Sequence, residues 1–74
     1  MDYRTFFNEV ATWIEQCNQM AMQHSMESQV FWKWVSDSIG ELSKKYGNNQ
    51  LVNKQLVMLF LWLEDVYADT KKTQ

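Results

Sequence analysis

The stretch LVMLFLWL (residues 56–63) consists of eight consecutive apolar residues. An unbroken apolar run of this length is compatible with a buried strand or with a segment of a buried helix. Val57 is the single β-branched residue of the run, and the run continues a helical stripe that begins at Val52, so we expect a helix. A helix that is apolar on all sides must be covered on all sides. The second side is covered either by the other helices of the chain, if this helix is the central element of the bundle, or by another protein molecule. We favour the intermolecular contact, because two neighbouring helices cannot fully cover a third.

The helix predicted around this run covers residues 50–70. At about 100° per residue, Leu61 points away from Val52, so the two residues lie on opposite sides of the helix. The predicted core stripe contains Val52, Leu56, Leu59, Leu63 and Val66, with Phe60 and Tyr67 beside it. The far side carries Val57, Met58 and Leu61, with Trp62 near its edge, and the polar residues Lys54, Glu64 and Asp65 around them.

Two more amphipathic helices are predicted, over residues 2–23 and 26–46. Apolar residues recur in both at intervals of three and four, which is typical of a helix with one buried side. Asp2 is expected either to cap the first helix or to act as an acid in its first turn. The predicted core positions are Tyr3, Phe6, Val10, Trp13, Cys17 and Met20 in the first helix and Phe31, Val35, Leu42 and Tyr46 in the second.

The joint between these two helices is the segment HSMES (residues 24–28). It contains no glycine or proline, the residues that most often interrupt a helix. The heptad phase also runs through it, because Cys17, His24 and Phe31 are seven residues apart. We favour a turn with Ser25 capping the next helix, and one continuous helix is the alternative.

The segment KKYGNN (residues 44–49) predicts a firm boundary between the second and third helices. Its two lysines suit the last turn of a helix, where the dipole favours cations. Gly47 can take the left-handed conformation that ends many helices, and Asn48 or Asn49 can cap the next one. Because this connection is short, the helices on either side of it should be antiparallel neighbours.

The expected fold class is all-α: a compact three-helix bundle formed by residues 1–70 as a single domain, followed by a frayed tail at residues 71–74. If the 24–28 joint is continuous, the alternative is a long helical hairpin that pairs with a second copy into a dimeric four-helix bundle. A domain of 74 residues is marginally stable unless something supplements its core. One cysteine cannot form an intrachain disulfide, so the remaining supplements are close packing of the helices and self-association, which we expect in either arrangement.

The composition excludes several classes of protein. A content of 46% hydrophobic and 15% aromatic residues argues against disorder. The net charge of −2 and the scattered lysines predict no nucleic-acid partner. No window reaches the roughly 18–20 apolar residues of a membrane span. A single cysteine and no export pattern predict a cytoplasmic protein, of a size and layout typical of short bacterial or phage proteins.

No catalytic, cofactor or metal site is expected from the nucleophiles and metal ligands. Cys17 lies on a core stripe, and His24, the one histidine, is about 10 Å further along the same helix. That distance is too long for a nucleophile and its base. His24 and Glu27 could touch one metal ion, but a structural site needs about four ligands.

The acidic residues form two pairs, each one helical turn apart: Asp37 with Glu41, and Asp65 with Asp69. In an antiparallel hairpin folded at Gly47, the two pairs would lie more than about 10 Å apart along the helix axes. They cannot share an ion within one chain. A metal-dependent enzyme whose acidic site is assembled across a dimer is therefore an alternative interpretation.

The segment VFWKWV (residues 30–35) places two tryptophans around Lys33. Trp32 and Trp34 diverge by about 160° on a helix, so both cannot be central in a core. At least one should be half-exposed, either covering the edge of the core or serving as a binding anchor, since tryptophan is favoured at interface hot spots.

The predicted function is that of a small non-enzymatic protein–protein interaction module, self-associating as a homodimer through the helix at residues 50–70. The alternative partner is another protein, for a stoichiometric inhibitor or immunity-type protein that docks on one target. An exposed apolar patch with a polar rim is typical of both kinds of interface. The residues predicted to form the interaction surface are Val57, Met58, Leu61, Trp62, Trp32 and Trp34.

Overall fold

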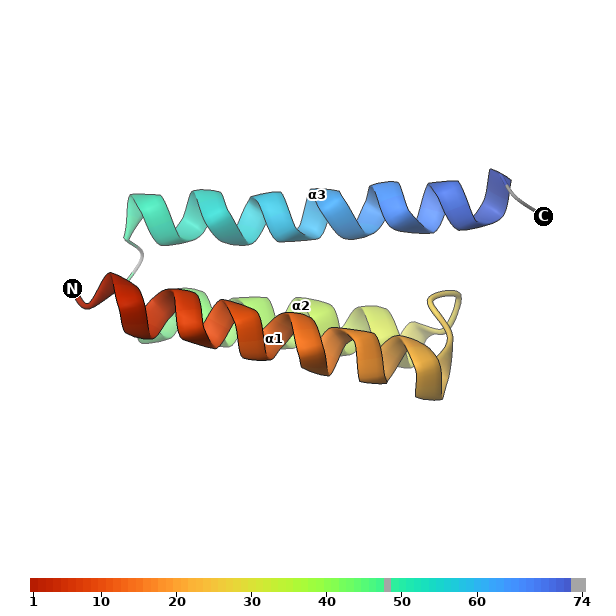
Figure 1. The fold of residues 1–74 in the computed structure, drawn as a ribbon, viewed down its shortest axis with the longest axis horizontal. Helices are drawn as coiled ribbons and strands as arrows, with labels where there is room; N and C mark the ends of the chain where they lie inside the picture. Colours follow the sequence, from red (N-terminus) through yellow and green to blue (C-terminus); the bar gives the residue numbers. More distant parts are fainter. Residues whose placement is uncertain (48, 73–74) are drawn as a thin grey trace. The chain divides into compact units, whose positions relative to one another are not determined.

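The computed structural model describes the backbone of residues 1–47 and 49–72 and the side chains of these residues up to Thr70. Three helices follow one another along the chain: α1 (Tyr3–His24), α2 (Gln29–Lys45) and α3 (Gln50–Lys72). The described residues contain no strand (Figure 1). The predicted all-α class, with the three helices of a three-helix bundle, is confirmed.

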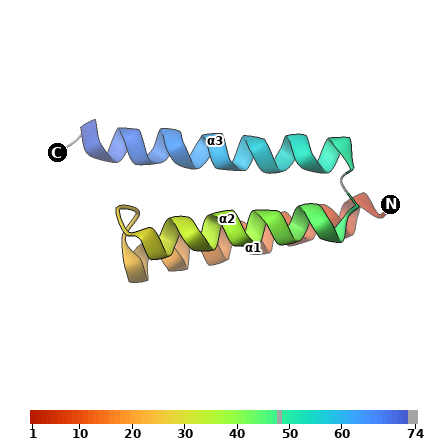
Figure 2. The same ribbon diagram turned by 180° about the vertical axis from the view of Figure 1, so that it is seen from behind.

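The chain divides into two compact units within which the residues are in close contact. Unit 1 is Met1–Ser38, which contains α1 and the first part of α2. Unit 2 is Ile39–Gln74, which contains the rest of α2 and α3. In each unit the two helical segments run antiparallel, because each is joined to the next by a short turn (Figure 2).

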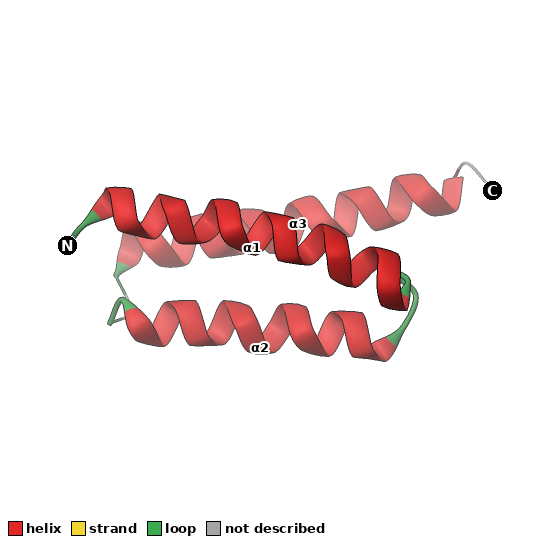
Figure 3. Ribbon diagram, turned by 60° about the horizontal axis from the view of Figure 1, so that its bottom comes forward, coloured by secondary structure: helices red, strands yellow, loops and turns green. Residues whose placement is uncertain are grey.

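The joint between α1 and α2 in unit 1 is a turn, and this overturns the alternative of one continuous helix. After α1 ends, Ser25 takes a positive φ of 67°, and its N–H donates to the Ala21 carbonyl at 3.0 Å. The Ser28 N–H then donates to the Ser25 carbonyl at 3.2 Å, which closes the turn (Figure 3). The long hairpin is therefore wrong, as is the dimeric four-helix bundle built from it.

The predicted cap of α2 is also wrong by three residues. The Ser28 hydroxyl, not that of Ser25, accepts a hydrogen bond from an N–H of the first turn, that of Phe31, at 3.2 Å. Ser25 instead uses its hydroxyl inside the turn, where it accepts from the Glu27 N–H at 3.2 Å. The turn takes up four residues, so α2 begins at Gln29 rather than at the expected residue 26.

The start of α1 is capped as expected. One Asp2 carboxylate oxygen accepts from the Thr5 N–H at 3.2 Å, and the other accepts from the Thr5 hydroxyl at 2.7 Å. These hydrogen bonds favour the ionised form, so they lower the pKa of the Asp2 carboxyl below its ordinary value. The cap thus depends on a charge that acid can remove.

The apolar core positions of unit 1 are largely those that the helical periodicity predicts. Tyr3 is the exception, because it lies in the first turn at the end of the chain and is exposed. Val10 and Met20 are half-buried. The buried residues of unit 1 are Phe6, Trp13, Cys17, Phe31 and Val35.

The turn between α2 and α3 in unit 2 forms where the sequence predicts it. Gly47 has a φ of 65°, and its N–H donates to the Lys44 carbonyl at 3.1 Å. A left-handed φ is accessible to glycine without the clash that a Cβ atom would cause. Of the two candidate caps for α3, Asn48 lies outside the described residues.

Asn49 caps α3. Its side-chain carbonyl oxygen accepts from the Leu51 N–H at 2.9 Å and from the Val52 N–H at 3.2 Å. Further along, the Ser43 hydroxyl of α2 donates to the Asn53 side-chain oxygen of α3 at 2.8 Å. The bond between Ser43 and Asn53 joins α2 to α3 within unit 2.

The core stripe of α3, which we define as Val52, Leu56, Leu59 and Leu63, is buried as predicted. Val66 and Tyr67, expected to extend it, are half-buried. The helix continues to Lys72, so the tail expected at residues 71–74 begins as helix, and residues 73–74 lie outside the described residues.

Candidate functional site: the apolar face of α3

Three large apolar side chains gather on the side of α3 opposite its core stripe, and a fourth, Trp62, lies at the edge of that side. Val57 is 57% exposed, Met58 54%, Leu61 53% and Trp62 41%. Residues three and four apart are neighbours on a helix surface, and these four are linked by such spacings (57 to 61, 58 to 61, 58 to 62). They form one contiguous patch, which we call the apolar face of α3.

This face exists because the run at residues 56–63 has no polar interruption. Every third or fourth residue of the run enters the core stripe, and the residues between them must then point outward. Leu61 follows Val52 by nine residues, which is half a turn out of phase at about 100° per residue. The run is nonetheless short, and no described helix combines the length and apolar character that a membrane span requires.

Trp62 is the largest side chain of the apolar face. It makes no hydrogen bond and no ring contact with any described residue. A tryptophan indole carries both a large apolar surface and an N–H that finds a partner when it is buried. Trp62 therefore has an unused donor beside an apolar patch, a combination suited to a protein contact.

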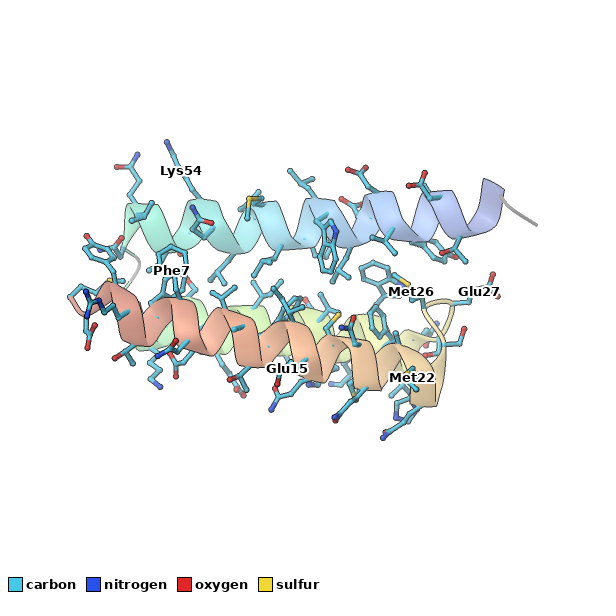
Figure 4. The ribbon with its side chains drawn as sticks, in the orientation of Figure 1. Phe7, Glu15, Met22, Met26, Glu27 and Lys54 are labelled. Carbon is cyan, nitrogen blue, oxygen red and sulfur yellow. The ribbon has the colours of Figure 1, made fainter. Side chains whose placement is uncertain are left out.

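Charged residues border the apolar face at both ends. Lys54 lies one turn before it, and Glu64 and Asp65 lie directly after it. All three are exposed, and no described residue forms an ion pair with any of them. The Lys54 side chain projects from α3 on the side turned away from α2 (Figure 4). The expected polar rim is thus present, with opposite charges at its two ends.

Two further exposed apolar residues of α3 were not predicted to lie on a surface. Leu51 is exposed and precedes Met58 by seven residues, a heptad spacing that places it on the same side of the helix. That spacing is the signal that identifies it. Phe60, expected beside the core stripe, lies at its exposed edge, about 80° from Val52 around the helix.

The structure places Trp32 and Trp34 in unit 1, each half-buried. The Trp32 indole N–H donates to the Met26 carbonyl at 2.6 Å, and its ring meets Phe31 edge-on with centroids 5.2 Å apart. Trp34 stacks on Trp13 with ring centroids 5.4 Å apart and an 18° interplanar angle. Both rings thus cover the edge of the core of unit 1, in contrast to the free ring of Trp62.

The nucleophile and the base singled out in the sequence do not form a reactive pair. Cys17 is buried, and this burial raises the pKa of its thiol. A thiol with a raised pKa keeps its proton at neutral pH and is a poor nucleophile. His24 is exposed as the last residue of α1.

The four acidic residues singled out in the sequence are exposed to solvent. Asp37 is exposed and forms an ion pair with Lys33, in which Nζ and Oδ2 are 3.6 Å apart. Glu41, Asp65 and Asp69 are also exposed. Within the part of the chain that the structure describes, no three His, Cys, Asp or Glu residues are grouped so that they could hold a metal ion.

Comparison of the chain with protein-family models, with curated proteins and with solved structures finds no match. Function must therefore be inferred from the exposed side chains and their chemistry. The apolar face of α3 is the feature that stands out among them.

Proposed function

We propose that this protein is a small non-enzymatic module that acts in the cytoplasm by protein–protein contact through the apolar face of α3. One observation carries the proposal: Val57, Met58, Leu61 and Trp62 are all about half exposed on one side of one helix. A contiguous apolar patch with a polar rim usually marks a surface that another protein covers. A single free cysteine suits the reducing cytoplasm.

The apolar face can supply a useful binding free energy. Full burial of a large apolar side chain is worth about 1.5–3 kcal/mol, so the exposed halves of four contribute on the order of 3–6 kcal/mol per chain. Two such faces packed together gain about twice that, from which the loss of rigid-body freedom must be subtracted. Because that loss offsets much of the gain, we expect a weak dimer that forms in a concentration-dependent way.

The chemistry of the other candidate residues supports a role without catalysis. Burial raises the pKa of the Cys17 thiol, which works against a nucleophilic role. Asp37 is exposed and forms a surface ion pair with Lys33. A solvated helix surface accounts for these acids without a dimer-assembled site.

Self-association is the favoured form of contact. A twofold dimer needs one patch that matches itself, and twofold dimers are the commonest oligomers. The apolar face has apolar residues at its centre and opposite charges at its two ends, so a copy turned by 180° presents a complementary pattern. A separate target protein would need to provide that pattern independently.

Sedimentation velocity of the wild-type chain and of Leu61→Glu tests the proposal. We expect a concentration-dependent dimer for the wild type and a shift of at least tenfold toward monomer for the variant, because it places a carboxylate at the centre of the contact. Met22→Glu is the matched control, since Met22 is 86% exposed on α1, outside the apolar face (Figure 4). Circular dichroism verifies that both variants remain helical.

A monomeric wild type directs the test to another partner. In that case, affinity capture from cell extract with Leu61→Glu as the negative bait should retain a protein on the wild type alone. The proposal is wrong if the chain is monomeric and both baits retain the same proteins.

A further inference from the structure

We infer that the apolar face of α3 is covered by a second copy of the same chain, with the two α3 helices antiparallel and Lys54 of each copy level with Asp65 of the other. This inference rests on the proposed function and adds the identity, direction and register of the partner. It is carried by the order of apolar and charged residues along one exposed side of α3.

Six exposed residues of α3 follow the alternating four-three spacing of a coiled-coil seam. The spacing keeps them in one line along the helix, on the side opposite the core stripe. The two central members of the line are apolar, the next on either side are charged with opposite signs, and the outermost are apolar again. In chain order they are Leu51, Lys54, Met58, Leu61, Asp65 and Ala68.

An antiparallel pair matches this line to itself. When Met58 of one copy is set level with Leu61 of the other, Lys54 falls level with Asp65, and Leu51 falls level with Ala68. The twofold axis then passes midway between residues 59 and 60, so each match occurs twice. Every apolar member of the line faces an apolar one, and every charge faces its opposite.

Other arrangements lose this match. A shift of one heptad in one direction sets Lys54 level with Met58, and a shift in the other direction sets Asp65 level with Leu61. Either shift places charges against apolar side chains, which are poor partners for them. A parallel pair sets Lys54 against Lys54 and Asp65 against Asp65, which is repulsive at both ends. The charges therefore select both direction and register.

Both charged groups are available for an intermolecular contact. Lys54 and Asp65 are exposed, and neither forms an ion pair with a described residue. Glu64 lies next to Asp65 and strengthens the negative end of the seam. The Lys54 side chain extends away from α2 (Figure 4), so the second copy can approach it without displacing α2.

A charge-swap series read by sedimentation equilibrium tests the inference. Lys54→Glu and Asp65→Lys each place two like-charged pairs in the dimer, and we expect each to weaken it about three- to tenfold at low salt. The double variant restores opposite charges at both pairs and should return the Kd to within about twofold of wild type. Glu15→Lys on α1 makes the same charge change as Asp65→Lys outside the seam and should leave the Kd unchanged.

The outcomes separate this inference from the proposed function. A dimer that Leu61→Glu disrupts but that the double variant does not restore overturns the antiparallel register and leaves the contact function in place. A wild-type chain that stays monomeric overturns the second copy as partner. The contact function then survives if capture of another protein is lost in Leu61→Glu, and it fails with the inference if capture is unaffected.

Discussion

Trp13 of unit 1 and Trp62 of unit 2 both belong to amphipathic helices, yet Trp13 is buried and Trp62 is exposed. Trp13 is buried, stacks on Trp34, and its indole N–H donates to the Ser38 hydroxyl at 2.7 Å. Trp62 is exposed and makes no such contact with a described residue. The same side chain is a structural element in one unit and an unpartnered surface in the other.

This difference separates the tryptophans that pack within their unit from the one that does not. In unit 1, Trp13, Trp32 and Trp34 all have ring contacts within the unit, and Trp13 and Trp32 also have specific hydrogen bonds there. In unit 2, the core stripe of α3 is aliphatic, and an aromatic residue is left outside it. We therefore expect the tryptophans of unit 1 to contribute to stability and Trp62 to contribute to binding.

The largest expected effect comes from truncating these two residues. Trp13→Ala should lower the free energy of unfolding by about 3–5 kcal/mol, as is usual for a buried tryptophan. Trp62→Ala should change the unfolding of the monomer by less than about 1 kcal/mol and should weaken the dimer instead. Urea unfolding at concentrations below the dimer Kd measures both values. Equal losses of stability would contradict the comparison.

The next effect concerns the hydroxyl groups that join helical segments in each unit. Ser38→Ala leaves the buried Trp13 N–H without its acceptor and should cost about 1–3 kcal/mol. Ser43→Ala in unit 2 removes the hydroxyl that donates to the Asn53 side-chain oxygen. Because Asn53 is half-buried and water can replace this donor, the substitution should cost about 0.5–1.5 kcal/mol. Urea unfolding measures each cost.

Trp13→Phe provides the control for this pair of variants. In its background, Ser38→Ala should lose most of its effect, because no indole N–H is left unpaired. A full effect of Ser38→Ala in that background would show that the hydroxyl acts through another contact.

Much of this arrangement could be predicted from the sequence, because it follows from helical periodicity. The stripe from Val52 to Leu63 and the turn at Gly47 were predicted, and the side chains of Val57, Met58 and Leu61 are exposed as a helical wheel requires. What these exposed residues bind stays a prediction, since one chain carries half of any interface.

The turn at residues 24–28 shows why other features could not be predicted. Its sequence has no glycine or proline, and a serine takes the positive φ that glycine normally provides. Ser25 and Ser28 are equally good caps by composition, and the geometry of the turn decides between them. Periodicity identifies a helix but carries little information about where it stops when the heptad phase continues.

A smaller effect is expected at the two turns, because each contains one residue with a positive φ of nearly the same value. Ser25 in unit 1 has φ 67°, and Gly47 in unit 2 has φ 65°. Ser25→Gly should be more stable than Ser25→Ala by about 1 kcal/mol, because both lose the hydroxyl but only glycine relieves the positive φ. Gly47→Ala should lose about 1 kcal/mol, a purely conformational cost, since a Cβ there would meet nothing within 4 Å.

Thermal unfolding of the four chains measures these differences. Equal stability of Ser25→Gly and Ser25→Ala would show that the turn relaxes away from the positive φ. An unchanged stability of Gly47→Ala would show the same for the turn of unit 2.

The smallest effect distinguishes the two helix caps by their response to acid. Hydrogen bonds from Thr5 hold the pKa of Asp2 below its ordinary value of 3.8, whereas the Asn49 amide that caps α3 does not titrate. Because the pKa is lower in the folded chain, the carboxylate contributes stability that is fully present above about pH 4. That contribution is lost as the pH falls through the folded pKa.

Unfolding of wild type and Asp2→Asn between pH 7 and pH 2 measures this contribution as a difference, which cancels the titration of the other acids. We expect a small advantage of wild type at pH 7 that disappears at the acid end. The effect is small because Asp2 is exposed and solvent screens its charge. Asn49→Ala serves as the control, since the stability it loses should be the same at both pH values. A wild-type advantage that persists at pH 2 would mean that α1 is capped by the geometry of the Asp2 side chain rather than by its charge, as α3 is by Asn49.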